Sequence, residues 1–283
     1  MLVRAMLSKA HATGGHCKTA LARRSPHLAC MTPDHTTTTP PGADFPFYNG
    51  QPVALGARQW CFILLALAAA YGALYIPAMV AWRVSGGWAA LIPALVFPAL
   101  PLLALRAVAG PQWQVLFRRM GWRDLGLAVG LVFLSIGVTV VVALIVAHFF
   151  GAVPNPVIQA LAGMGTAEKL VFMASTVPHL IGEEILTVLP FLALLTWLAG
   201  PLRWPRRRAI AGAWVLASVL FGALHLPTYG WNVAQSLIII STSRAVLWLA
   251  YLRTKNLSVA ALAHILNDWL LLGIVLVLGA VIG

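Results

Sequence analysis

The chain has 283 residues, of which 60% are hydrophobic and only 9% are charged, and its mean hydropathy is +0.87. Because a soluble domain carries about 25% charged residues, this composition excludes an ordinary soluble protein and indicates an integral membrane protein. The formal net charge is +12, but the basic residues lie in the amino-terminal region and in short connections. That distribution is typical of orientation signals in membrane proteins and argues against a nucleic-acid partner.

Residues 1–58 differ in composition from everything that follows. They are rich in Thr, Ala, Pro, His and Arg, and they show no apolar periodicity. We predict that this basic region is disordered and that residues 59–283 form a transmembrane domain. The three cysteines, Cys17, Cys30 and Cys61, show neither metal-type spacing nor an obvious disulfide pairing.

Seven apolar stretches after this region are long enough to cross a bilayer. A crossing needs about 20 apolar residues, because a helix rises about 1.5 Å per residue through a core about 30 Å thick. The predicted spans are Gln59–Trp82, Trp88–Leu105, Leu125–Phe150, Lys169–Ala199, Ala209–Leu226, Val233–Leu252 and Leu257–Ile282. The predicted fold class is therefore an all-α, polytopic transmembrane helical bundle of about seven or eight spans.

Basic connections predict how this bundle is oriented. They carry Arg118, Arg119 and Arg123, then Arg203, Arg206, Arg207 and Arg208, and then Arg253 and Lys255. If Lys169–Ala199 crosses once, an inside amino terminus places all three connections on the inner side. The alternative is an eighth span, formed if this stretch folds back at Pro178 or Pro190, which would weaken the charge bias.

Three of the seven acidic residues, Glu183, Glu184 and Asp268, lie inside apolar stretches. A charge at the bilayer centre costs about 2.5–3.5 kcal/mol, so such residues are rare and usually functional. The alternative is a structural polar contact between helices. A pair of glutamates accompanied by histidines on other spans favours a functional site.

Histidines supply the rest of the candidate site. His225 ends one predicted span. On the last span, Asn267 and Asp268 follow His264 by three and four positions, so the three side chains lie on about the same helix face. His148 and His179 are further candidates, but neither belongs to a recognisable spacing, and we favour their interpretation as interhelical hydrogen-bond donors.

A carboxylate beside an imidazole can hold and deprotonate a water molecule, and a His/Asn pair on a facing helix can stabilise an oxyanion. The sequence has no Gly-x-Ser-x-Gly elbow and no His-Glu-x-x-His zinc helix, and no cysteine lies near these histidines. Two carboxylates and two imidazoles could also coordinate a divalent metal such as zinc. The sequence does not separate a bound metal from catalysis by a glutamate alone, and it points to no other cofactor.

These residues form three motifs that resemble those of the CAAX-protease and bacteriocin-processing family (CPBP, or Abi) of intramembrane proteases. The family pattern is Glu-Glu-x-x-x-Arg, then Phe-x-x-x-His, then His-x-x-x-Asn or Asp. Here Glu183-Glu184, Phe221–His225 and His264–Asp268 stand in that order, and the resemblance covers about residues 168–283.

The resemblance implies a role for each matched residue. Glu183 would activate the attacking water with help from His225. His264, together with Asp268 or its neighbour Asn267, would stabilise the oxyanion. Glu184 would support the site, for instance by ordering the helices.

The first motif lacks its arginine, because Val188 stands where the family pattern has that residue. Arg244, deep inside the span Val233–Leu252, is our candidate to replace it as the structural partner of Glu184. The alternative is that Arg244 extends its side chain to an interface.

The third motif ends in Asp268 rather than the commoner Asn, and an ionised Asp would repel an oxyanion. Either Asp268 is protonated, or Asn267 is the donor, or Asp268 orients His264. We favour the last, because a carboxylate acceptor one turn away can fix an imidazole tautomer.

The leading interpretation is an intramembrane endopeptidase, CAAX-protease-like, in the plasma or inner membrane. Its partners are the lipid bilayer and a peptide or membrane-protein substrate. One alternative is a non-catalytic scaffold, immunity or regulatory protein of the same fold, which the missing arginine favours. A second is a transporter with an acidic proton or ion relay, but no inverted repeat stands out.

Overall fold

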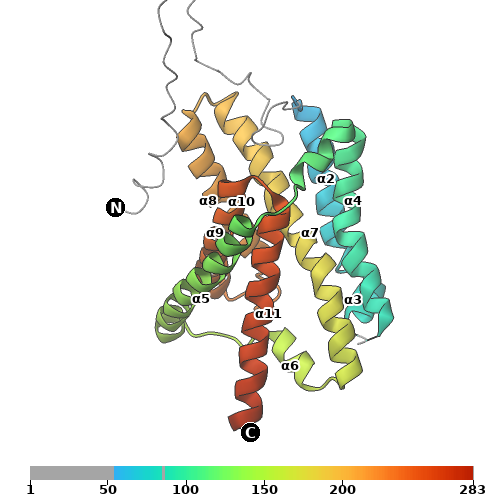
Figure 1. The fold of residues 1–283 in the computed structure, drawn as a ribbon, viewed down its shortest axis with the longest axis vertical. Helices are drawn as coiled ribbons and strands as arrows, with labels where there is room; N and C mark the ends of the chain where they lie inside the picture. The colour runs from blue at the N-terminus through green and yellow to red at the C-terminus, as the bar shows by residue number, and fades with distance from the viewer. Residues whose placement is uncertain (1–53, 85–86, 283) are drawn as a thin grey trace, which may run out of the picture. The chain divides into compact units, whose positions relative to one another are not determined.

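Helices make up the secondary structure of the membrane domain. The computed structural model describes residues 54–84 and 87–282 (Figure 1), so the predicted disordered region lies outside the described residues up to position 53. Across the described ranges the chain forms helices and no strand, which confirms the predicted all-α class.

The first predicted span is broken. α2 (Ala57–Ala73) and α3 (Pro77–Val84) meet at a bend of 66° instead of forming one straight helix over Gln59–Trp82. Pro77 explains the break, because proline has no N–H to donate and disfavours helical geometry in the residue before it. The second span is longer than predicted, and joins η1 (Trp88–Ala90), α4 (Leu91–Ala109) and η2 (Gly110–Leu116).

α7 (Thr166–Ala199) is one unbroken helix, long and apolar enough to cross a membrane once. It follows α5 (Trp122–Phe150) and the short α6 (Pro156–Ala162), and its 34 residues continue without interruption through both internal prolines. The fold-back that an eighth span would require is therefore absent. Carbonyl groups freed by a proline are tolerated inside a membrane protein where neighbouring helices and hydroxyl side chains surround them.

The last third of the chain packs around α7. It comprises α8 (Arg206–Leu224), the π-helix η3 (Gln235–Ile240), α9 (Ser241–Leu247), α10 (Leu249–Thr254) and α11 (Leu257–Ile282). In the most apolar window of α7, 67% of the residues are buried, against 22% in α5. α7 is thus the central helix, and α5 presents large apolar side chains outward, as a lipid-facing helix does.

Six helical stretches of the described ranges are long and apolar enough to cross a membrane, and seven if the bent pair α2–α3 counts as one span. Their outward side chains include Phe133, Leu144 and Phe149, all well exposed. Together these features support an integral, multi-pass membrane protein.

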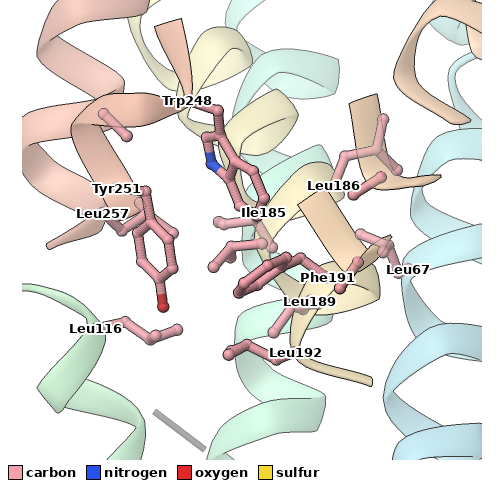
Figure 2. Packing of buried hydrophobic residues seen from close by; sticks show 14 of the residues in the cluster. Leu67, Leu116, Ile185, Leu186, Leu189, Phe191, Leu192, Trp248, Tyr251 and Leu257 are labelled. Carbon is pink, nitrogen blue, oxygen red and sulfur yellow. The ribbon is translucent and has the colours of Figure 1, made fainter. Parts of the chain in front are cut away.

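An aromatic cluster fixes α7 against the α9–α10 segment (Figure 2). The ring of Phe191 meets Trp248 edge-on, with centroids 4.6 Å apart, and Trp248 stacks on Tyr251 at 5.4 Å. Such pairs contribute about 0.5–1.5 kcal/mol each beyond the area that they bury. This packing holds two segments that carry the polar groups described below.

Two of the basic connections are joined directly. The backbone N–H of Arg118 donates to Asn256 Oδ1 at 3.1 Å, and Asn256 Nδ2 donates to the Arg118 carbonyl at 3.0 Å. The connection between α7 and α8 lies toward the same end of the bundle (Figure 1). The predicted orientation places all three basic connections on one side of the membrane, and their position at a common end of the bundle agrees with it.

Candidate functional site

The two adjacent glutamates of α7 point in different directions, because successive residues of a helix are about 100° apart. The side chain of Glu184 is 1% exposed, whereas that of Glu183 is 16% exposed. The two glutamates consequently have different partners and different chemical environments.

Glu184 forms a buried ion pair with Arg244. The guanidinium Nη1 lies 2.6 Å from Glu184 Oε1, and the Arg244 side chain is also 1% exposed. Its Nε and Nη2 donate to Thr187 Oγ1 at 3.0 and 2.7 Å, and its Cζ lies 4.4 Å from the centroid of the Phe221 ring. An arginine of another helix thus meets the carboxylate, while Val188 is buried in the apolar core.

Local helix geometry brings Arg244 to this position. The wide turn of η3 shifts the register of α9, as π-bulges often do beside functional sites. Gly222 lets α8 approach this turn closely, since a Cβ at that position would lie 2.1 Å from Ser241 Oγ and 2.5 Å from the Ser236 carbonyl oxygen. The close approach places the carboxyl end of α8 next to the span that carries Arg244.

His264 of α11 bridges the two glutamates. Its Nδ1 lies 3.0 Å from Glu184 Oε1, and its Nε2 lies 3.7 Å from Glu183 Oε2. Arg244 Nη1 is 3.2 Å from the same Nδ1. The imidazole is therefore held through Nδ1, and Nε2 faces the more accessible carboxylate.

Asp268 and Asn267 lie beside this imidazole. Asp268 Oδ2 is 3.7 Å from His264 Nε2, and its side chain is 36% exposed. Asn267 is buried, and its Nδ2 donates to Asp268 Oδ1 at 3.1 Å. The shortest contact between His264 and a carboxylate is therefore with Glu184, at 3.0 Å, rather than with Asp268.

His225 caps the carboxyl end of α8. Its Nδ1 lies 2.9 Å from the Phe221 carbonyl oxygen. Because a carbonyl can only accept, Nδ1 carries the hydrogen and the neutral ring keeps a lone pair on Nε2. His225 thus offers a hydrogen-bond acceptor at the end of its span.

His179 belongs to this cluster, and its interpretation as an interhelical donor was wrong. Its Nε2 lies 3.4 Å from Glu183 Oε1 of the same helix. The signal was present, since His179 and Glu183 have the four-residue spacing that joins His264 to Asp268. His148 is exposed at the end of α5, where its ring packs on Phe149.

Tyr229, in the loop between α8 and η3, is a second residue that the motifs did not indicate. Burial, together with the charges of Asp268 and Glu183, raises the pKa of Tyr229 to about 12. Its hydroxyl therefore stays protonated at neutral pH and can donate a hydrogen bond near the two acids.

The donor atoms of the cluster already contact one another. Across residues 54–84 and 87–282, no group of three or more His, Cys, Asp or Glu side chains is arranged to hold a metal ion. His264 Nδ1 contacts Glu184, and the Glu183 carboxylate contacts two imidazoles. The arrangement has no preformed zinc cage, and a bound metal stays a prediction.

A comparison with protein families finds the same segment. Residues 165–270 match the family described as type II CAAX prenyl endopeptidase, Rce1-like. All three motifs lie within that range, and the match confirms the resemblance drawn from them. No curated protein and no solved structure matches the chain.

Proposed function

From the match of residues 165–270 to the type II CAAX prenyl endopeptidase, Rce1-like family, we propose that the protein is a membrane protease in which Glu183 activates the water that hydrolyses a peptide bond. One observation carries the proposal. Glu184 is bound tightly by Arg244 at 2.6 Å and by His264 at 3.0 Å, while Glu183 has only longer contacts of 3.4 and 3.7 Å to two imidazoles.

The two carboxylates have different tasks in this proposal. A carboxylate held by a guanidinium and an imidazole is a poor proton acceptor, so Glu184 acts as the structural anchor of three helices. Glu183 is more exposed and less tightly held, which suits a group that must gain and release a proton in each cycle.

The proposed reaction is a direct hydrolysis. Glu183 takes a proton from water while the water oxygen bonds to the peptide carbonyl carbon, and the carbonyl π electrons move to its oxygen. When the carbonyl re-forms, the C–N bond breaks, and Glu183 gives its proton to the leaving amine. His225 Nε2 accepts a hydrogen bond from the second O–H of the water and so orients the nucleophile, while that hydrogen stays on the water oxygen.

His264 is the proposed donor to the oxyanion. Its Nδ1 lies 3.0 Å from Glu184 Oε1 and 3.2 Å from Arg244 Nη1, and with a hydrogen on Nδ1 toward the carboxylate, a donor at Nε2 requires the imidazolium form. Three carboxylates and one guanidinium surround this ring, so the charge around it is negative in sum. The positive charge of the imidazolium offsets part of that negative charge. Asn267 and Asp268 then support the Nε2 side of the ring.

An apolar cavity supports a membrane-protein or apolar peptide substrate. It has a volume of about 1010 Å³ and lies among α2, α7 and α8. Leu186, two positions after Glu184, and Leu224, directly before His225, line it, although neither Glu183 nor His264 is among the lining residues. We propose that the apolar part of the substrate enters here from the bilayer of a plasma or inner membrane.

The non-catalytic scaffold is the second candidate, and the absence of the motif arginine was the observation that favoured it. Arg244 supplies a guanidinium to Glu184 from another helix. The glutamate pair therefore keeps the partner that the family pattern leads one to expect, which supports an enzyme.

Cleavage of a reporter-peptide library by the purified protein in lipid tests this proposal. Glu183→Gln is expected to lower the rate by about 10²–10⁴-fold, which is the usual contribution of a general base. Glu168→Gln is the matched control, because Glu168 caps the start of the same helix and glutamine can still accept from Gly165. Full activity in Glu183→Gln would remove Glu183 as the base, and an inactive wild type would favour the scaffold.

Removal of metal tests the remaining cofactor alternative. If glutamate alone activates the water, a strong chelator leaves the cleavage rate of the wild type unchanged. Inhibition by the chelator that added zinc reverses would support a metal-dependent enzyme instead.

A further inference from the structure

His179 is an imidazole of the site that neither the motifs nor the proposed reaction uses. It lies one turn before Glu183 on α7, and its side chain is 28% exposed. We infer that His179 is a positioning residue that fixes the orientation of the Glu183 carboxylate. This inference rests on the proposed role of Glu183 as the base.

The geometry around Glu183 carries this inference. His179 Nε2 lies 3.4 Å from Oε1, and His264 Nε2 lies 3.7 Å from Oε2, so each oxygen faces a different imidazole. The last torsion of a glutamate side chain has a broad energy profile and does not fix itself. Two partners on the two oxygens restrict that torsion, and losing one of them frees the carboxylate to rotate away from the reacting water.

Phe97 of α4 holds the His179 ring from the side. The two ring centroids are 5.3 Å apart, and Phe97 is buried. Phe97 can lie there because Gly182 has no side chain, since a Cβ at Gly182 would lie 2.4 Å from Phe97 Cδ1. The glycine before the glutamate pair thus admits the aromatic ring that supports His179.

The helix spacing sets the direction of the contact. Residues four apart lie on the same helix face, with side chains inclined toward the amino terminus, so Glu183 reaches back to His179. The 3.4 Å separation is longer than an ideal hydrogen bond, and active-site contacts of this kind commonly shorten when substrate binds. His179 therefore acts through Glu183 without needing to touch the substrate.

Two substitutions separate the hydrogen bond from the packing. His179→Gln keeps an N–H donor near the position of Nε2 but loses the ring against Phe97. His179→Phe keeps the aromatic ring but loses the donor.

We expect His179→Phe to lower kcat about tenfold with KM unchanged, because the effect lies in the orientation of the base. His179→Gln keeps a donor and is expected to retain most of the wild-type kcat. A fully active His179→Phe protein would overturn the inference, as would equal losses in both variants.

An infrared measurement reports on the carboxylate without any turnover. The carboxylate band of Glu183 is assigned from the difference between wild type and Glu183→Gln. It is expected to shift in His179→Phe and to stay near its wild-type position in His179→Gln. An unshifted band in His179→Phe refutes the positioning role even if the wild type cleaves peptides, whereas a shifted band supports it even if no substrate is cleaved. His148→Phe is the control, because His148 lies exposed on α5 outside the cluster.

Discussion

Arg244 contributes to the site through every nitrogen of its guanidinium. It pairs with Glu184, donates to Thr187 from two nitrogens, and reaches the backbone carbonyl of Glu183 at 3.3 Å. A buried ion pair of this kind is costly to disrupt, since removing one partner leaves the other charge uncompensated away from water.

Replacing Arg244 by methionine is therefore expected to destabilise the protein by about 3–5 kcal/mol. Chemical unfolding in detergent measures this change, and Arg253→Met on the exposed side of α10 is the control. The double variant Glu184→Gln/Arg244→Met should lose less than the sum of the single variants, because neither charge is then left alone. Unchanged stability in Arg244→Met would show that the pair does not anchor the helices.

At this scale the sequence predicted most of the residues but few of their contacts. Rare acids in apolar stretches and the order of three motifs indicated Glu183, Glu184, His225 and His264. The pairing of Arg244 with Glu184 could be offered only as a candidate, because it depends on the register of α9 after the π-helix. His179 was a candidate that we ranked low, because partners for Glu183 were sought on other spans rather than one turn away on its own helix.

Gly222 controls the approach of α8 to the η3–α9 segment. Any side chain at this position meets the backbone carbonyl of Ser236 and the hydroxyl of Ser241. α8 carries His225, and α9 carries Arg244, so a change in their separation alters both halves of the site.

Gly222→Ala is expected to lower stability by about 1–3 kcal/mol, the usual cost of overpacking, and to lower activity with it. Gly126→Ala on α5 is the matched control, because nothing lies within 4 Å of the new Cβ there. That variant should be neutral or more stable, since alanine favours a helix over glycine by about 0.5–1 kcal/mol. Thermal unfolding of both variants, with cleavage rates, checks the contrast. Equal behaviour would mean that helix contact at Gly222 is unimportant.

Hydropathy predicted which stretches could cross a membrane, but not where each helix bends or ends. It found every stretch long enough to cross, because an apolar segment of that length must form a helix to satisfy its backbone in lipid. It could not say that Pro77 bends the first span while Pro178 and Pro190 leave α7 unbroken. That difference comes from the neighbours of each proline, since Pro77 begins a new helix and the other two lie within a surrounded one.

The described part of the chain is a helical bundle in which α7 lies at the centre and the polar groups gather around it. α7 contributes both glutamates and His179, and the carboxyl-terminal helices cover these groups with Arg244, His225 and His264. A single crossing by α7 places the connections before α5 and after α7 on the same side of the membrane.

Single cysteines test this topology in a background in which Cys17, Cys30 and Cys61 are replaced by serine. Met120→Cys and Leu202→Cys are expected to react with an impermeant maleimide from one side of a sealed vesicle, and Val153→Cys from the other. All three side chains are exposed, so access is limited by the bilayer alone. Labelling of positions 202 and 153 from the same side would mean that α7 does not cross once.

We propose that the two adjacent glutamates have separate tasks: Glu183 takes part in the chemistry, and Glu184 anchors the helices. The most direct measurement is the peptide-cleavage rate of Glu183→Gln and Glu184→Gln, each normalised to its folded fraction from thermal unfolding. We predict that Glu183→Gln unfolds like the wild type and loses cleavage by at least about 10²-fold. Glu184→Gln should unfold at a clearly lower temperature, because Arg244 loses its buried counter-charge. A Glu183→Gln protein that cleaves at the wild-type rate, or a stable Glu184→Gln protein that is inactive, would contradict this division.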